Sequence, residues 1–253
     1  MIKMIVTDLD GTLLRRDKSI SDYTATILNR CKRNGIKVVY ATARPERATR
    51  QFHEKIVPDY VIADNGATIN HGDSVIHNLL IPSTMRDELL NLFLAAEAVK
   101  LIAVEAGNCV FTNYNGPPWD IGWNIIYNDF SAGIEADTSK LSVECENIDF
   151  LSGVMRTYPE LHLYSNSGES WHQIMCKDAT KTNAIRCISK MLGFTLGEIV
   201  AFGDDYNDVE MLKQCGVGVA MANAIDETKA AADYICGMND KDGVAKWLEE
   251  NAM

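Results

Sequence analysis

Two aspartates near the N-terminus have the spacing of a reactive pair. Asp8 and Asp10 follow a short apolar run, and residues two apart on an extended strand point to the same side. Close carboxylates repel each other, and a cation or a shared proton usually offsets that repulsion. Gly11 lets the chain turn sharply after the pair, and Thr12 follows it. An ordinary Asp-Gly turn would explain Gly11, but it would not explain both aspartates.

A second acidic group follows another apolar run far along the chain. It contains Asp204, Asp205 and Asp208, together with the amide of Asn207. Oxygen ligands at this density suit Mg²⁺, which binds carboxylates, water and phosphate. Asp205 or Asn207 could also cap the helix that follows, and such a role is compatible with metal binding. The segment therefore predicts a magnesium site.

Two further segments offer groups that can hold an anion. Thr42, Ala43 and Arg44 end a third apolar run, where a hydroxyl and backbone N–H groups can bind phosphate oxygens. Lys181 comes one residue after Thr180 at the start of a predicted helix, where its charge opposes the helix dipole unless an anion is bound there. Taken alone, the first segment is better explained as an ordinary strand end and the second as an exposed lysine.

The predicted elements explain how these segments could meet. Apolar runs of strand length alternate with segments of helical periodicity in the first and last parts of the chain. The strand-like runs are 4–7, 37–40, 60–63, 198–202 and 217–220, and the helical segments are 21–34, 180–192, 207–214, 225–232 and 243–250. This alternation predicts the α/β class, a doubly wound parallel sheet covered by helices on both faces. Because the carboxyl ends of parallel strands share one edge, the reactive segments are expected to meet there.

The middle of the chain has a different composition. Residues 83–170 contain four basic and thirteen acidic residues, and they are more polar than the rest. This shift predicts an inserted α+β domain at 83–170, with 1–82 and 171–253 forming the core. Four aromatic residues in the insertion or next to its end could stack on a sugar or could form the interior of the insertion, namely Tyr114, Trp119, Trp123 and Trp171.

Composition excludes several classes of function. The 253 residues are 47% hydrophobic, which is typical of a globular protein, and the net charge of -11 opposes binding to nucleic acid or to an anionic membrane. No apolar run is long enough to predict a spanning helix, and the apolar N-terminal run is too short for a signal peptide. Seven scattered cysteines favour reduced thiols, so we expect a cytoplasmic protein.

Taken together and in order, these segments resemble the motifs of the haloacid dehalogenase superfamily of phosphatases. The closest likeness is to its Cof-type branch, which carries a large α/β cap. Residues 8–12, Thr42, Lys181 and 203–208 resemble the first to fourth motifs, and Asn65 with its following glycine is similar to the branch's usual Asn-Gly. The insertion falls where this branch carries its cap. The resemblance covers the whole chain and implies a Rossmann-like core.

The resemblance also implies a role for each segment. Asp8 is the expected nucleophile, which forms an aspartyl-phosphate, and Asp10 is the expected acid and base. The expected cofactor is Mg²⁺, held by Asp8, the backbone carbonyl of Asp10, and Asp204. The expected phosphate-binding residues are Leu9, Thr42, Ala43, Lys181 and Asn207; Ala43 replaces the family's usual glycine but keeps the N–H. The expected supporting residues are Thr12, Arg44, Asn65, Asp205 and Asp208.

The predicted reaction is hydrolysis of a small phosphorylated metabolite. The acidity of the insertion would repel extra negative charge, which favours a sugar or polyol monophosphate over a bisphosphate. A phosphomutase that uses the same aspartyl-phosphate stays an alternative, as does a catalytically idle module that binds a phosphorylated ligand. The sequence leaves a monomer and a homodimer equally open.

Overall fold

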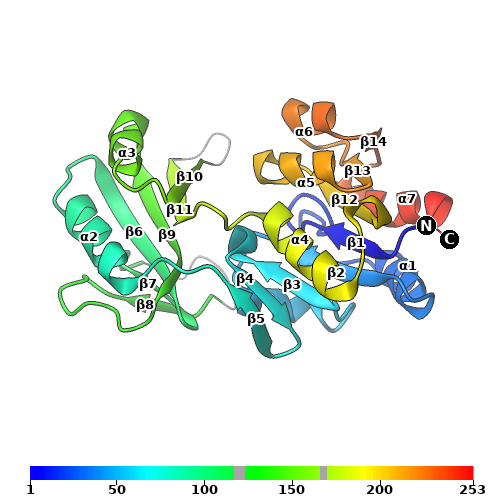
Figure 1. The fold of residues 1–253 in the computed structure, drawn as a ribbon, viewed down its shortest axis with the longest axis horizontal. Coiled ribbons are helices and arrows are strands. Elements are labelled where there is room, and N and C mark those ends of the chain that lie inside the picture. Colours follow the sequence, from blue (N-terminus) through cyan, green and yellow to red (C-terminus); the bar gives the residue numbers. More distant parts are fainter. Residues whose placement is uncertain (117–122, 166–169, 253) are drawn as a thin grey trace. The chain divides into compact units, whose positions relative to one another are not determined.

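The chain folds into two compact units. The computed structural model describes residues 1–116, 123–165 and 170–252 (Figure 1). The first unit is Met1–His77 with Thr180–Met253, and the second is Asn78–Ala179. The second unit is longer than the predicted insertion at both ends. Residues 171–179 belong to it because β11 (Trp171–Cys176) pairs with β9 (Thr138–Cys145), and residues 78–82 belong to it because Ile81 hydrogen-bonds Thr138.

An eight-stranded sheet forms the centre of the first unit. Its order is β14-β13-β12-β1-β2-β3-β4-β5. These strands are β1 (Met4–Thr7), β2 (Lys37–Ala41), β3 (Tyr60–Ala63), β4 (Thr68–His71), β5 (Ser74–Asn78), β12 (Ile199–Gly203), β13 (Val217–Ala220) and β14 (Tyr234–Ile235). The pairs from β14 to β3 are parallel, and β3 pairs with β4 antiparallel. The predicted α/β class with a parallel core sheet is confirmed.

The register of β1 places the reactive segments at one edge of this sheet. Thr7, the last residue of β1, lies opposite Tyr40 on β2 and Phe202 on β12. All three strands run in the same direction, so the residues that follow them emerge side by side. β1 is buried along its whole length, as expected for a central strand with helices on both faces.

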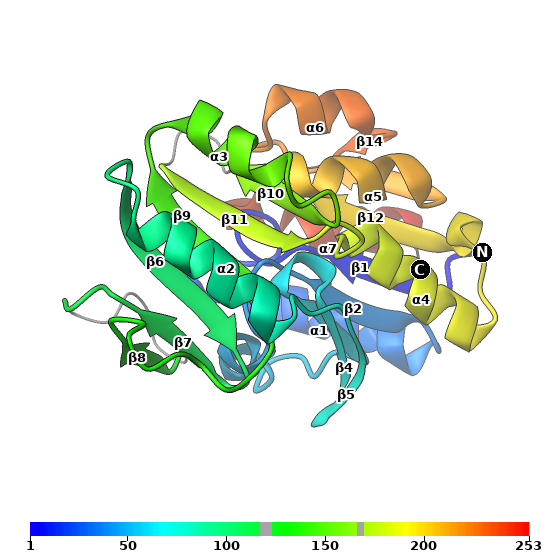
Figure 2. The ribbon, with the colours of Figure 1, turned by 60° about the vertical axis from the view of Figure 1, so that its left-hand side comes forward.

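Helices cover both faces of the sheet. They are α1 (Asp22–Arg33), α4 (Lys181–Leu192), α5 (Val209–Gln214), α6 (Asp226–Ala231) and α7 (Gly243–Asn251). α1 contacts α7, and α4 contacts α5; Figures 1 and 2 show these two pairs on opposite faces. The predicted start and stop signals of α4 are present: the side chain of Thr180 accepts a hydrogen bond from the N–H of Asn183, and Gly193 is left-handed at the other end.

In its described residues, the second unit is a six-stranded sheet with two helices. The strand order is β10-β11-β9-β6-β7-β8, and the pairs are antiparallel except for β7 with β8. The remaining elements are β6 (Val99–Ala106), β7 (Cys109–Thr112), β8 (Ile125–Tyr127), β10 (Leu161–Ser165), α2 (Ser83–Leu94) and α3 (Ile148–Met155). Apolar residues of both helices pack with alternate residues of β6 and β9, such as Val104 and Val143. The unit therefore has an apolar core of its own.

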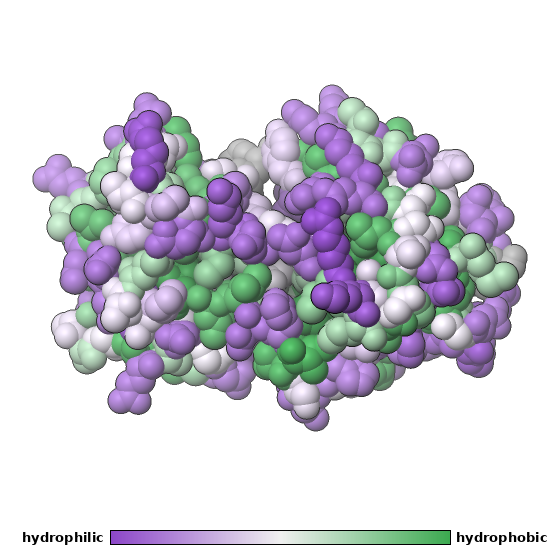
Figure 3. Space-filling model, viewed as in Figure 1, coloured by the Kyte–Doolittle hydropathy of each residue, from purple (hydrophilic) through white to green (hydrophobic). Residues whose placement is uncertain are grey.

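The surface has few extended apolar areas on the face drawn in Figure 3. One apolar area lies over the β4–β5 hairpin, where Val75 and Ile76 are exposed (Figure 3). All seven cysteines are free. Within the part of the chain that the structure describes, no helix combines the length and the apolar character needed to cross a membrane.

Candidate active site

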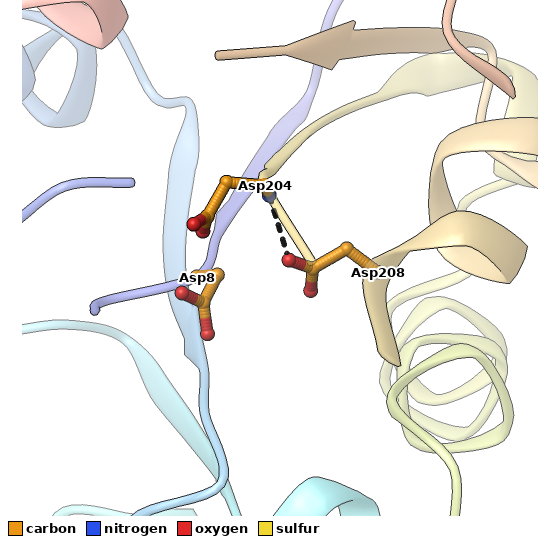
Figure 4. Close-up of side chains that lie close together, drawn as sticks. All are labelled: Asp8, Asp204 and Asp208. Carbon is orange, nitrogen blue, oxygen red and sulfur yellow. Dashed lines mark hydrogen bonds between the residues drawn. The ribbon is translucent and has the colours of Figure 1, made fainter. Parts of the chain in front are cut away.

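Three carboxylates meet at the carboxyl edge of the first unit's sheet. Asp8 follows β1, Asp204 follows β12, and Asp208 precedes α5. One oxygen of each lies within 4.8 Å of the others, and Figure 4 shows the three side chains converging. Asp8 and Asp208 are buried. Together with Lys181, these residues form what we call the acid cluster.

Lys181 supplies the positive charge of the acid cluster. Its Nζ donates to Oδ1 of Asp8 and to Oδ1 of Asp208, each at 2.7 Å. The side chain is fully buried at the first turn of α4. Although burial lowers the pKa of Lys181, the charges of Asp208 and Asp8 raise it above its usual value. The lysine is therefore a fixed cation, and the unfavourable position at a helix N-terminus is offset by two anions.

Asp208 fixes the backbone that carries Asp204 in the acid cluster. Its Oδ2 accepts the backbone N–H of Asp204 at 2.8 Å, drawn as a dashed line in Figure 4, and that of Asp205 at 3.2 Å. A side chain at Gly203 would overlap Asp208, which explains the glycine at the end of β12. Because both oxygens of Asp208 bind protein donors, Asp8 and Asp204 are the members that can offer an oxygen to a ligand.

Asp204 is oriented by the turn that follows the first aspartate pair. Thr12 Oγ1 donates to Asp204 Oδ1 at 2.6 Å. Gly11 has a φ of +81°, and a β-carbon there would overlap the Asp204 carboxylate. The side chain of Asn223 donates to the Gly11 carbonyl at 2.7 Å and so fixes this turn. Sequence reasoning missed Asn223, although it follows the strand β13 and the strand-end rule could have found it.

The electrostatics of the acid cluster fit a bound divalent cation. Burial raises the pKa of Asp8 well above its usual range; Asp208 and Asp204 add to this effect, while Lys181 opposes it. Burial also raises the pKa of Asp204 to about 7, against the hydrogen bond from Thr12. A cation shared by Asp8 and Asp204 would offset both the burial and the repulsion, and carboxylate oxygens are the ligands that Mg²⁺ prefers.

The side chain of Asp10 lies in a different environment. Arg44 Nε and Nη2 donate to its two oxygens at 2.6 and 2.8 Å, and Lys18 Nζ donates at 2.7 Å. Although burial raises the pKa of Asp10, hydrogen bonds from Arg44 and Lys18 together lower it below the usual value. We call these three residues the Asp10 clamp. Sequence reasoning missed Lys18, and it placed Arg44 only in a general supporting role.

The other predicted residues surround these two groups. Thr42 is buried after β2, and its Oγ1 accepts the N–H of Arg44 at 3.1 Å. Asn207 Nδ2 donates to Asn65 Oδ1 at 2.9 Å. Asp205 caps the segment before α5 by accepting the N–H of Tyr206 at 2.8 Å, which is the capping alternative predicted for it. Leu9 is buried and Ala43 half-buried beside these groups in sequence.

Known proteins share the sequence pattern and the fold. A family model described as haloacid dehalogenase-like hydrolase matches residues 5–248. The 5-amino-6-(5-phospho-D-ribitylamino)uracil phosphatase YitU of Bacillus subtilis (strain 168) is 28% identical over 263 residues, which cover 98% of this chain and 96% of that protein. The phosphatase YwpJ of the same organism is 29% identical over 288 residues, with 98% and 99% covered. A crystal structure of a haloacid dehalogenase-like hydrolase from Bacteroides thetaiotaomicron has a TM-score of 0.84 and 26% identity, with 99% of both chains covered.

Proposed function

Because the chain belongs to the haloacid dehalogenase-like hydrolases, we propose that it is a magnesium-dependent phosphatase that hydrolyses a small phosphorylated metabolite. The family predicted from the motifs, and the phosphatase class predicted with it, are confirmed by the comparisons. The magnesium ion, the substrate class and the covalent intermediate are proposals. The observation that carries them is the buried contact of Lys181 with Asp8, at 2.7 Å, beside Asp204.

Asp8 is the proposed nucleophile. Lys181 binds its Oδ1, and the second lone pair of Oδ1 would also be available to the proposed metal, so Oδ2 is the oxygen that attacks the phosphorus atom. The new bond joins Oδ2 to phosphorus while the bond from phosphorus to the ester oxygen breaks, and the leaving oxygen takes a proton as the alcohol forms. Water then attacks the aspartyl-phosphate, loses a proton, and releases inorganic phosphate and the free Asp8 carboxylate. The charge of Lys181 stabilises the negative charge on the transferring group.

Asp10 is the proposed carrier of both protons. In the first half-reaction it gives a proton to the leaving oxygen, and in the second it takes one from water. The Asp10 clamp favours the ionised form, which is the form that accepts a proton. For Asp10 to act as an acid, the hydrogen bonds from Arg44 and Lys18 to its carboxylate must weaken. The protonation state of Asp10 is therefore coupled to the positions of these two cations.

Magnesium is the proposed cofactor. Asp8, Asp204 and the backbone carbonyl of Asp10 would hold it, with Asp208 fixing Asp204 through the backbone. When bound, the ion supplies positive charge that keeps Asp8 ionised and neutralises charge on the phosphoryl group. Thr42, Leu9 and Ala43 would bind phosphoryl oxygens beside it.

A sugar or polyol monophosphate is the proposed substrate. The name of YitU describes a phosphorylated ribityl chain, which is a polyol monophosphate. The acidic balance of residues 83–170 disfavours a substrate with further negative charge. Among the aromatic residues predicted to stack or pack, Trp119 lies outside the described residues, and the Trp123 ring has Lys140 Nζ 5.7 Å from its centroid. Tyr114, Trp123 and Trp171 are all half-buried and are the described candidates for stacking on a sugar.

Phosphate release from a panel of sugar and polyol monophosphates tests this proposal. Each compound is assayed with Mg²⁺ and with EDTA, beside the matching bisphosphate. We expect magnesium-dependent release that favours the monophosphates. Turnover that is equal in EDTA would contradict the metal, and preference for bisphosphates would contradict the substrate class. Release that begins only after a bisphosphate is added would indicate a phosphomutase instead.

A further inference from the structure

A strained and buried turn follows β3 at the edge of the active site. Its residues Asp64, Asn65 and Gly66 form the 3-10 segment η2, and their φ angles are +46°, +53° and +108°. Asp64 and Asn65 are only 4% and 3% exposed. Left-handed backbone is unfavourable for residues other than glycine and persists only where the surroundings enforce it. The turn is therefore held in place by its contacts.

Those contacts reach three of the four reactive segments. The backbone N–H groups of Asp64 and Asn65 donate to the carbonyls of Arg44 and Thr42 at 3.0 and 2.9 Å. The side chain of Asn65 accepts a hydrogen bond from Asn207 at 2.9 Å, directly beside Asp208. The turn thus joins the segment after β2 to the acidic segment after β12.

The third contact is steric. A β-carbon on Gly66 would overlap the backbone carbonyl of Thr180, the residue that caps α4 immediately before Lys181. The backbone of the turn therefore lies directly against the helix start that carries the cation of the acid cluster. Gly66 allows this approach, and its positive φ is accessible to glycine without strain.

We infer that the turn is a positioning device for the active site and that Asn65 is a positioning residue acting through Asn207. Glycine at position 65 would remove the backbone strain, but it would lack the oxygen that Asn207 binds. Asn65 therefore keeps an unfavourable backbone conformation, and its side chain fixes the position of Asn207 and of the acidic segment. This inference rests on the proposed function, because it concerns the same site.

The variant Asn65→Gly separates the backbone from the side chain. It is expected to melt close to the temperature of the native protein, because relief of the left-handed backbone offsets the lost hydrogen bond and the added freedom of the unfolded chain. Its kcat is expected to fall about ten- to a hundredfold, with a smaller change in KM, as for other partners that orient reactive groups. The matched control is Asn124→Gly in the second unit. Asn124 is also a left-handed asparagine, and its amide donates to the backbone carbonyl of Asn108.

A double-mutant cycle tests the route through Asn207. If Asn65 acts through it, Asn65→Gly combined with Asn207→Ala loses no more kcat than Asn207→Ala alone. Native kcat in Asn65→Gly, an equal loss in Asn124→Gly, or additive losses in the cycle would each overturn the inference.

A second readout needs no turnover. The rise in melting temperature caused by Mg²⁺ with inorganic phosphate is expected to be smaller in Asn65→Gly, in Asn207→Ala and in the double variant, and by the same amount. A native-sized rise in Asn65→Gly overturns the positioning role. A native protein that hydrolyses no phosphate monoester contradicts the proposed function, while the melting experiment still decides the role of Asn65.

Discussion

The acid cluster and the Asp10 clamp place two neighbouring aspartates in opposite environments. Asp8 is buried with two further carboxylates and one cation, whereas Asp10 is more exposed and bound by two cations. Burial raises the pKa of Asp8; at Asp10, where burial also raises the pKa, Arg44 and Lys18 lower it below the usual value. Asp8 and Asp10 are only two residues apart, but Asp8 needs additional positive charge whereas Asp10 already has it.

This difference shows which groups must change during the proposed reaction. The nucleophile must be ionised, and burial among carboxylates opposes that state unless a cation is added. The acid must be protonated, and the Asp10 clamp opposes that state unless the clamp loosens. Local charge within the chain therefore opposes the state that each proposed role requires, so the reaction depends on an added cation at Asp8 and on a loosened clamp at Asp10.

The largest expected effect is on the rate of hydrolysis when Asp8 and Asp10 are substituted one at a time. Asp8→Asn should reduce hydrolysis of every phosphate ester to the background rate, because no aspartyl-phosphate can form. Asp10→Asn should lose about 10²–10⁴-fold on a sugar phosphate but much less in the first turnover of p-nitrophenyl phosphate, whose leaving group needs no proton. Rapid-quench kinetics measure both, with the exposed Asp73→Asn as control. Equal losses on the two substrates in Asp10→Asn would contradict the acid role.

The next effect concerns the stability of the acid cluster. Lys181→Met leaves Asp8 and Asp208 buried without their shared cation, so the free energy of unfolding should fall by about 3–5 kcal/mol. Urea denaturation at neutral pH in EDTA measures this change. Lys3→Met is the matched control, because its exposed ion pair with Glu198 is screened by water and should contribute far less. A similar fall in the free energy of unfolding in the two variants would contradict the idea that Lys181 offsets the repulsion between Asp8 and Asp208.

A smaller effect follows from the titration of Asp204. Its pKa of about 7 in the folded chain lies above the value of about 3.9 in an unfolded chain, so the folded state binds the proton more tightly. In EDTA, this contribution to the free energy of unfolding is fully present below pH 4 and is lost as the pH rises through 7. A fixed Mg²⁺ concentration, a hundred times the Kd at pH 7.5, should add about 2.7 kcal/mol at pH 7.5 and less at pH 5, where protonation of Asp204 raises the Kd.

Denaturation at several pH values measures the Asp204 effect. Asp204→Asn should flatten the pH dependence in EDTA and weaken the stabilisation by Mg²⁺. Asp73→Asn serves as the control that keeps both. A native pH dependence in Asp204→Asn would assign the titration to another group of the acid cluster.

The smallest expected effect tests the Asp10 clamp alone. Lys18→Met removes one of its two cations, so the pKa of Asp10 should rise toward its usual value while Arg44 still holds it. Because the acid form of Asp10 is needed, the alkaline limb of kcat/KM for a sugar phosphate should move to higher pH. Lys55→Met, which breaks an exposed ion pair with Asp22, is the control. A limb that moves to lower pH would contradict the assignment of Asp10 as the acid.

The meeting of the acidic segments could be predicted because it depends on backbone topology. Parallel strands end at one edge, and this rule was enough to bring Asp8 near Asp204. Lys181 opens a helix, so its place beside them was expected only from the motif resemblance. The direction of the Asp10 side chain could not be predicted, because it depends on the loop that carries Lys18, a residue with a left-handed backbone (φ +62°).

The boundaries of the second unit also could not be predicted from the sequence pattern. Trp171–Cys176 has the apolar character of a core strand, and only its pairing with β9 assigns it to the second unit. The connection between Asn65 and Asn207 joins two loops whose geometry is set by packing, and no spacing rule brings them together.

The insertion of the second unit between β5 and α4 determines when the reactive contacts can form during synthesis. Asp8 and Lys181 are 173 residues apart in the chain. At about 5–20 residues per second, roughly 9–35 s pass on the ribosome between the two. Until α4 is made, Asp8 has no counter-ion, and until β12 follows, one edge of β1 has no partner. The nascent half-sheet is thus the stage most exposed to aggregation, and the time needed to synthesise the second unit sets how long that stage lasts.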